Sequence, residues 1–100
     1  MSVTSDIQFV RRENLRKCSA YVEHYNNGAQ ILVSYTTAVA GIDQNGQIFV
    51  GPDWDCSITT HKHVRYFLGL YAGEIRARIE EGRIIKTDSE SKLVDGVMGR

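Results

Sequence analysis

The fold is decided by residues 20–50, which read AYVEHYNNGAQILVSYTTAVAGIDQNGQIFV. Two Asn-Gly pairs, Asn27-Gly28 and Asn45-Gly46, divide this stretch into segments rich in β-branched and aromatic residues. Asn-Gly suits a two-residue type I′ turn, because both central residues of that turn need a positive φ. Two antiparallel hairpins are therefore predicted. Residues 29–43 lack a strong break, so they form either one long strand bent near Thr36-Thr37 or two strands that meet at a corner.

A two-residue loop at Asn27-Gly28 sets the register of the first hairpin, because it pairs Tyr25 with Gln30 and Val22 with Val33. In the second hairpin the same loop type pairs Ile42 with Phe49. One face of the first hairpin then collects Cys18, Ala20, Val22, Ile31, Val33 and Tyr35, and the other collects Tyr21, Glu23, Tyr25, Gln30, Leu32 and Ser34. Such a separation predicts a hairpin with one face buried and the other in water.

One main helix is predicted at about residues 60–81. Its apolar positions recur at helical spacing and are Val64, Leu68, Tyr71, Ile75 and Ile79. Thr59 or Thr60 is the expected N-cap. Gly69 and Gly73 lie within this range, and each costs about 1 kcal/mol relative to alanine in a helix interior. The helix therefore either breaks there or approaches the sheet closely.

The two ends of the chain carry weaker patterns. Ser5-Asp6-Ile7-Gln8 matches a capping box and favours a short helix within residues 5–16, although an edge strand fits as well. Residues 54–58 fit a short strand or an extended approach to the helix, and residues 83–86 fit a short strand. Residues 87–100 are expected to form a loosely held tail unless their apolar residues dock a final turn. The predicted fold is α+β: an antiparallel sheet of three to five strands, with the helix on one face, in a single domain spanning residues 1–100.

Composition excludes several classes of protein. Twelve Lys and Arg balance twelve Asp and Glu among the 100 residues, which argues against a globally basic nucleic-acid binder. No apolar run approaches the roughly 20 residues of a membrane span, and no signal-peptide pattern opens the chain. A cytoplasmic protein without a membrane partner is expected. The charge is nevertheless segregated, since residues 43–58 carry −3 and residues 59–86 carry +3.

The predicted helix start is the first candidate binding site. Its residues are Thr59, Thr60, Lys62, His63 and Arg65. Backbone N–H groups of a first helical turn, a hydroxyl and cationic side chains together suit a phosphate, a carboxylate or a partner protein. The alternative is that the threonines only cap the helix and the charges are solvated.

The outer face of the first hairpin is the second candidate. Tyr21 and Tyr25 lie on this face, close in sequence to Arg11, Arg12 and Arg16. Tyrosine with arginine is typical of protein interfaces and of platforms that stack single-stranded bases. The alternative is that the N-terminal segment or the tail covers this face and makes it a second small core.

Metal and nucleophile chemistry find little support, so no metal, cofactor or catalytic residue is predicted. Asp53, Asp55, Cys56, His61 and His63 lie close in sequence, but histidines two residues apart diverge on a helix and cannot share one ion there. A cysteine triad needs a geometry that sequence proximity does not supply. Cys18 and Cys56 are instead interpreted as buried thiols.

Two short stretches resemble a pattern in a family of small bacteriophage and mobile-element proteins. The first is Ser34-Tyr35-Thr36-Thr37-Ala38-Val39-Ala40; the second is Ser57-Ile58-Thr59-Thr60-His61-Lys62-His63, followed by Phe67-Leu68. The family pattern is approximately Ser-Tyr-x-Thr-x-Val-Ala, then Ser-x-Thr-Thr-x-Lys-His-x-x-x-Phe-Leu. The resemblance spans residues 34–68, leaves His61 outside the pattern, and implies a phage or mobile-element origin without a mechanism.

A non-enzymatic intracellular binding protein is the leading interpretation of this sequence. Its expected partner is a host protein, for example a component of a defence system that it inhibits, or a second copy of the chain. The first alternative is a module that binds nucleic acid, a nucleotide or another anion, for which steep salt dependence would be the signature. The second is a small enzyme, which would need a concave pocket with converging polar groups.

Overall fold

The computed structural model describes residues 7–15 and 19–99. Its elements, in chain order, are β1 (Phe9–Asn14), β2 (Ala20–Tyr25), β3 (Gln30–Ser34), β4 (Thr37–Ile42), β5 (Ile48–Val50), α1 (Ile58–Leu68), α2 (Ala72–Glu80), β6 (Ile84–Lys86) and α3 (Glu90–Met98). The strands form one sheet in the order β1-β2-β3-β4-β5-β6. The predicted α+β class is confirmed, but the sheet is larger than expected and mixed.

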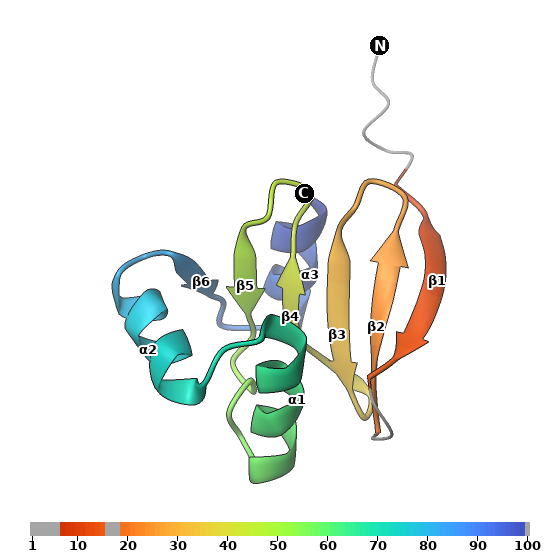
Figure 1. Cartoon of the computed structure of the whole chain (residues 1–100). Coiled ribbons are helices and arrows are strands. Elements are labelled where there is room, and N and C mark those ends of the chain that lie inside the picture. Colours follow the sequence, from red (N-terminus) through yellow and green to blue (C-terminus); the bar gives the residue numbers. More distant parts are fainter. Residues whose placement is uncertain (1–6, 16–18, 100) are drawn as a thin grey trace.

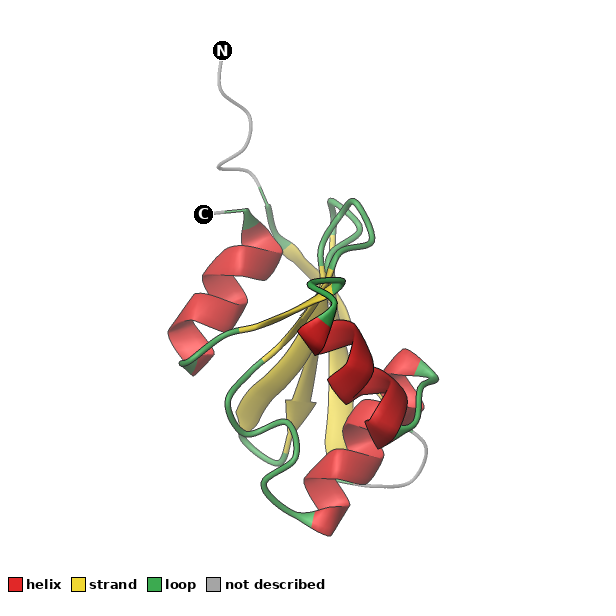
Figure 2. Ribbon diagram, turned by 90° about the vertical axis from the view of Figure 1, so that its left-hand side faces the viewer, coloured by secondary structure: helices red, strands yellow, loops and turns green. Residues whose placement is uncertain are grey.

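The sheet is an antiparallel meander with one parallel strand added at its end. Strands β1 to β5 pair antiparallel in chain order, whereas β6 pairs parallel with β5. Parallel neighbours need a crossover connection, and here α1 and α2 supply it. These two helices lie on one face of the sheet and α3 lies on the other, so the prediction of one helix on one face is wrong (Figures 1 and 2).

Both Asn-Gly hairpins form, but with three-residue loops. In the first loop the Tyr25 N–H donates to the Ala29 carbonyl and the Gly28 N–H donates to the Tyr25 carbonyl, each at 3.0 Å. Gly28 has φ of 93°, while Asn27 is not in the positive-φ region. This is a type I turn closed by a glycine bulge, a geometry that Asn-Gly suits as well as type I′. The Asn45-Gly46 turn has the same pattern of hydrogen bonds.

The extra loop residue shifts each predicted register by one. Val22 pairs with Leu32 instead of Val33, and Ile42 pairs with Ile48 instead of Phe49. The predicted division of β3 between the two faces is therefore reversed relative to β2. The error has a clear origin: Ile31-Leu32-Val33 is a continuous apolar run, and such a run is buried on both faces of a sheet.

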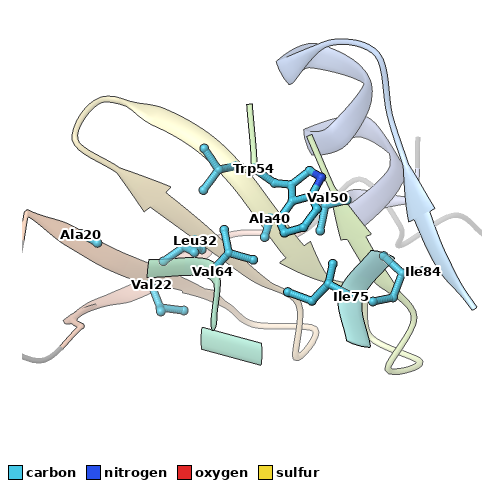
Figure 3. Close-up of a cluster of buried hydrophobic side chains, with 10 residues drawn as sticks. Ala20, Val22, Leu32, Ala40, Val50, Trp54, Val64, Ile75 and Ile84 are labelled. Atoms are coloured by element: carbon cyan, nitrogen blue, oxygen red, sulfur yellow. The ribbon is translucent and has the colours of Figure 1, made fainter. Parts of the chain in front are cut away.

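Two hydrophobic clusters follow from this two-sided burial. Figure 3 shows the first cluster, in which Trp54, Val64 and Ile75 cover Leu32 and Val50. The second cluster lies on the opposite face and is formed by Ala29, Ile31, Val33, Ala38, Phe49, Leu93, Val97 and Met98. Its last three residues belong to α3, so the segment predicted as a loose tail is a packed helix.

The connection between β3 and β4 is a tight hairpin. Ser34 pairs with Thr37, which leaves Tyr35 and Thr36 as a two-residue loop. Both predicted arrangements of residues 29–43, the bent strand and the corner, are therefore wrong. Tyr35 adopts φ of 57°, a conformation that is strained for a bulky residue. Its N–H donates to the Ser19 carbonyl at 2.7 Å, which helps to hold the turn.

The predicted helix at residues 60–81 is two helices. Gly69 takes φ of 71° and its N–H donates to the Arg65 carbonyl, which ends α1 as a left-handed glycine cap does. Of the two possibilities the sequence left open, the break is the one observed. Tyr71 consequently leaves the apolar stripe and is exposed. The N-cap of α1 is Ser57 rather than Thr59 or Thr60, so residues 54–58 form a turn and helix start instead of a strand.

The chain ends also differ in part from expectation. Phe9–Asn14 is an edge strand, so the preference for a helix in that part of residues 5–16 is wrong. Of the two residues of the proposed capping box, Ser5 lies outside the described residues, and the Gln8 N–H donates to the Asn26 Oδ1 at 3.0 Å. Residues 84–86 form the short strand that was predicted. Within the described part of the chain, no helix has the length and apolar character needed to cross a membrane.

Candidate functional site

The structure separates the five residues of the predicted helix-start site. Thr60 and His63 point toward the sheet and are buried, whereas Thr59 and Lys62 are exposed. Arg65 lies at the other end of α1, where its guanidinium carbon is 4.8 Å from the centre of the Tyr71 ring. Thr60 and His63 are therefore turned away from the surface that carries Thr59 and Lys62.

Thr60 and His63 instead belong to a polar network with Ser34, which is also buried, and with Ser57, which is exposed. The Ser34 Oγ and the His63 Nδ1 share a hydrogen bond of 2.8 Å, and the Ser34 Oγ lies 3.4 Å from the Thr60 Oγ1. The Ser57 Oγ accepts from the Thr60 N–H and donates to the Thr60 Oγ1, each at 3.1 Å. All four residues come from the two stretches that carry the phage-family resemblance, so those stretches meet in space.

This Ser34–His63 network stabilises the contact between α1 and the β3–β4 hairpin. A serine bonded to a histidine is also the arrangement of a nucleophile and its general base. Here, however, Ser34 is 3% exposed and His63 is 2% exposed, so the bonded atoms are closed to a substrate. Burial also lowers the pKa of His63. The neutral imidazole fits a buried hydrogen-bonded role.

Cys56 does not lie in a buried site. Its side chain is exposed, which corrects the prediction of a buried thiol, and it makes no hydrogen bond or ion pair with the described residues. His61 packs edge-on against Trp54, with ring centres 6.1 Å apart. Among residues 7–15 and 19–99, no three His, Cys, Asp or Glu side chains are grouped as metal ligands. Cys18 lies outside the described residues.

A shallow pocket lies beside the carboxyl end of β6. Its volume is about 280 Å³, and its lining residues are Trp54, Asp55, Arg76, Ile79, Glu80 and Lys86. This volume is at the lower limit for small-molecule sites, which usually measure roughly 300–1,000 Å³. Arg76 bonds Asp55 at 3.1 Å and lies 5.3 Å from the centre of the Trp54 ring, so its charge is already paired.

The β1–β2 ribbon, residues 7–15 and 19–28, is the most open part of the sheet. The helices pack mainly on β3 to β6, and Figure 1 shows no helix lying across β1. All six residues of β1 are exposed. Strand β1 therefore presents side chains that elsewhere in the sheet are covered by a helix, whereas Ala20 and Val22 of β2 are buried.

Aromatic and arginine side chains are held in place on the α3 side of this ribbon. The guanidinium carbon of Arg12 is 4.1 Å from the centre of the Tyr21 ring. Phe9 meets Tyr25 edge to face, with ring centres 6.0 Å apart. The Tyr25 hydroxyl donates to the Glu23 carboxylate at 3.0 Å. Cation–π and edge-to-face contacts of this kind fix the orientation of the side chains before any partner binds.

This face contains most of the residues predicted for the second candidate site. Tyr21 and Tyr25 are half-buried because their inner edges pack on the cluster beneath α3, so the tail does cover part of the face, as the alternative supposed. Arg12 lies on the same face as the two tyrosines, whereas Arg11 points to the other face of the sheet, where it is paired with His24. Arg16 lies outside the described residues. Phe9 is not among the predicted residues, because the pattern of the N-terminal segment favours a helix while leaving an edge strand open.

The comparison with protein families places this chain in a family of unknown function. The model of that family, DUF8033, matches residues 7–86, and the chain belongs to this family. The match runs from just before β1 to the end of β6, so it contains the ribbon and the Ser34–His63 network but not α3. Searches of curated proteins and of solved structures gave no match.

Proposed function

We propose that this protein is a non-enzymatic binding protein that makes a stoichiometric contact with a protein partner through the β1–β2 ribbon. The observation that carries the proposal is the ribbon face on which Phe9 and Arg12 are exposed and are held against the half-buried Tyr25 and Tyr21. Aromatic residues and arginine are enriched among the residues that dominate binding energy. Side chains oriented before binding also lose less entropy on association.

The phage resemblance of residues 34–68 supports a partner in the cytoplasm of a host cell, with a defence component among the candidates. The buried state of Ser34 and His63 favours binding over hydrolysis, because this nucleophile–base pair is closed to a substrate and serves packing. The small, charge-paired pocket beside Trp54 gives less support to a small-molecule enzyme than the ribbon gives to a binding surface.

The test uses a partner captured from host lysate, identified, purified and titrated against the intact protein. Phe9→Ala combined with Arg12→Ala should weaken its binding at least tenfold, because two exposed anchors are lost while the core is untouched. Ile58→Ala combined with Lys62→Ala is the matched control, since these exposed residues lie on the outer face of α1. Equal losses from both variants, or loss only from the α1 variant, would contradict the ribbon as the binding surface.

Nucleic-acid binding is the competing outcome of the same experiment. Residues 7–28 carry four basic and two acidic residues, and aromatic residues with arginines also stack single-stranded bases. A captured nucleic acid whose affinity falls steeply and log-linearly with salt would replace the protein partner, because phosphate contacts release counterions. A protein partner should show a much weaker salt dependence.

A further inference from the structure

Strand β1 has an open hydrogen-bonding edge, and this feature carries a more specific inference that rests on the proposed function. The strand order places β1 at one end of the sheet, so one side of its backbone has no neighbouring strand among the described residues. Phe9 and Val10 are 51% and 56% exposed, although both are apolar. An open edge bearing exposed apolar side chains is a template for an added strand.

The charges of β1 argue against a second copy of this chain as the added strand. Two copies of β1 can form an antiparallel pair about a two-fold axis perpendicular to the sheet. The axis then passes midway between one residue and the identical residue of the other copy. An axis at Arg11 places two arginines directly opposite each other, and an axis at Glu13 does the same with two glutamates. An axis at Arg12 pairs Arg11 with Glu13 on either side but still places two arginines opposite each other, so each register centred on a charged residue keeps one like-charged pair. Like charges directly opposite are destabilising. An axis at Val10 places Phe9 opposite Arg11, so it leaves the arginines without acidic partners.

The same charges are complementary to a different strand. Arg11 is opposite His24 and Arg12 is opposite Glu23, so the two neighbouring arginines point to opposite faces of the sheet. Two consecutive acidic residues in an added strand also point to opposite faces, and each would lie beside one arginine. A basic residue would then lie beside Glu13, and apolar residues would lie beside Val10 and Phe9.

We infer that β1 binds an extended acidic segment of a partner protein by strand addition. The added strand runs antiparallel to β1, as β2 does, because antiparallel pairing is the more stable arrangement. The added strand begins with a polar residue opposite Asn14 and a basic residue opposite Glu13. Two acidic residues follow opposite Arg12 and Arg11, and two apolar residues follow opposite Val10 and Phe9. The register shift between Phe9 and Arg11 interrupts regular pairing at Val10, so the segment is short.

The probe is the synthetic peptide acetyl-Thr-Lys-Glu-Glu-Val-Ile-Thr-amide, titrated into the isotopically labelled full-length protein by NMR. Its control is acetyl-Thr-Glu-Glu-Lys-Val-Ile-Thr-amide, which has the same composition and net charge in a different order. We expect the probe to bind several-fold more tightly than this control and to protect β1 amides from exchange. Equal binding of the two peptides would overturn the predicted pairing, because attraction of net charge alone would explain it.

A charge exchange tests the register directly. In the triple variant Arg11→Glu, Arg12→Glu, Glu13→Lys, the peptide acetyl-Thr-Glu-Lys-Lys-Val-Ile-Thr-amide should replace the original probe as the tighter ligand, by about tenfold. These three residues are exposed, so the variant is expected to fold, and its thermal unfolding is recorded as a check. An unchanged preference for the original probe would overturn the inference.

Backbone pairing is tested with the original probe N-methylated at both glutamates. Consecutive amides of a strand point in opposite directions, so one of the two methyl groups must block a hydrogen bond to β1. A tenfold or greater loss of affinity is expected, and undiminished binding would show that side chains alone hold the peptide.

The outcomes separate this inference from the proposed function. If none of the peptides binds but the captured partner is still lost with Phe9→Ala and Arg12→Ala, the ribbon is the binding surface and strand addition is overturned. If the peptide binds as expected but the partner is insensitive to the ribbon variant, the proposed function fails while the edge remains a peptide site. A concentration-dependent dimer in sedimentation that disappears in the Phe9→Ala, Arg12→Ala variant would identify a second copy as the occupant and overturn the inference.

Discussion

Removal of the Leu93 side chain tests whether residues 87–99 are part of the folded core. Leu93 is 0% exposed and packs with Phe49, Val97 and Met98 beneath the sheet. The helix around it is only nine residues long, which is too short to be stable by itself in water. Its stability must therefore come from packing, and Leu93 is its most enclosed side chain.

The expected cost of Leu93→Ala is about 2–5 kcal/mol, the range for a buried leucine whose cavity cannot fully collapse. A domain of this size has a total stability of roughly 5–15 kcal/mol, so the loss is a large fraction of the whole. Each kcal/mol lowers the melting temperature of such a domain by roughly 4–8 °C. A fall of about 10 °C or more is expected.

Urea unfolding followed by circular dichroism measures this loss, and thermal unfolding provides a second readout. Ser91→Ala is the matched control, because Ser91 is exposed on the same helix and should change stability by less than about 0.5 kcal/mol. If Leu93→Ala were as mild as this control, α3 would not be docked on the sheet, and the description of the second hydrophobic cluster would be wrong.

Three further predictions test other contacts. Ser34→Ala should destabilise the protein by about 1–3 kcal/mol in urea unfolding, because it leaves the buried His63 Nδ1 without its partner. Thr36→Ala is the exposed control, and an equal cost of the two substitutions would contradict a stabilising Ser34–His63 hydrogen bond. Stability should fall as the pH drops below 6.5, because burial lowers the pKa of His63 in the folded state and the unfolded chain then binds the proton more readily. Urea midpoints measured from pH 7.5 to 5 should fall less in His63→Gln than in the unmodified protein. Parallel pH profiles of the two proteins would refute the assignment to His63. At Gly41 an added Cβ would lie 2.5 Å from the Val97 Cγ2, so Gly41→Ala should lower the free energy of unfolding by roughly 1–3 kcal/mol. In the double variant, Val97→Ala should recover part of this loss. Additive losses of the two substitutions would argue against the contact.

The elements that depend on neighbours in sequence were accessible without the structure. The two Asn-Gly pairs place the hairpin turns, and the apolar stripe locates the helical region between residues 60 and 81. Gly69 already marked the possible break, because a glycine is costly inside a helix and suits the left-handed residue that ends one. In each case the deciding interaction lies within a few residues along the chain.

The register and the candidate site were harder to predict for physical reasons. Asn-Gly fits two turn types that differ by one loop residue, and that single residue exchanges the faces of a strand. Tyr21 and Tyr25 form a candidate surface that the sequence alone indicates, yet their contacts with Arg12 and Phe9 depend on the pairing of β1 with β2. Ser34 and His63 lie 29 residues apart, and nothing local indicates that they share a hydrogen bond.

The sequence by itself determined that this protein has β-hairpins followed by helical segments, because turn residues and apolar periodicity act locally. Only the tertiary structure decided that the sheet has two covered faces, that the C-terminal segment is a helix, and that β1 is left open at the edge. These outcomes depend on the burial of apolar surface between segments far apart in the chain. The free energy of that burial belongs to the assembled layers and to no single stretch of residues.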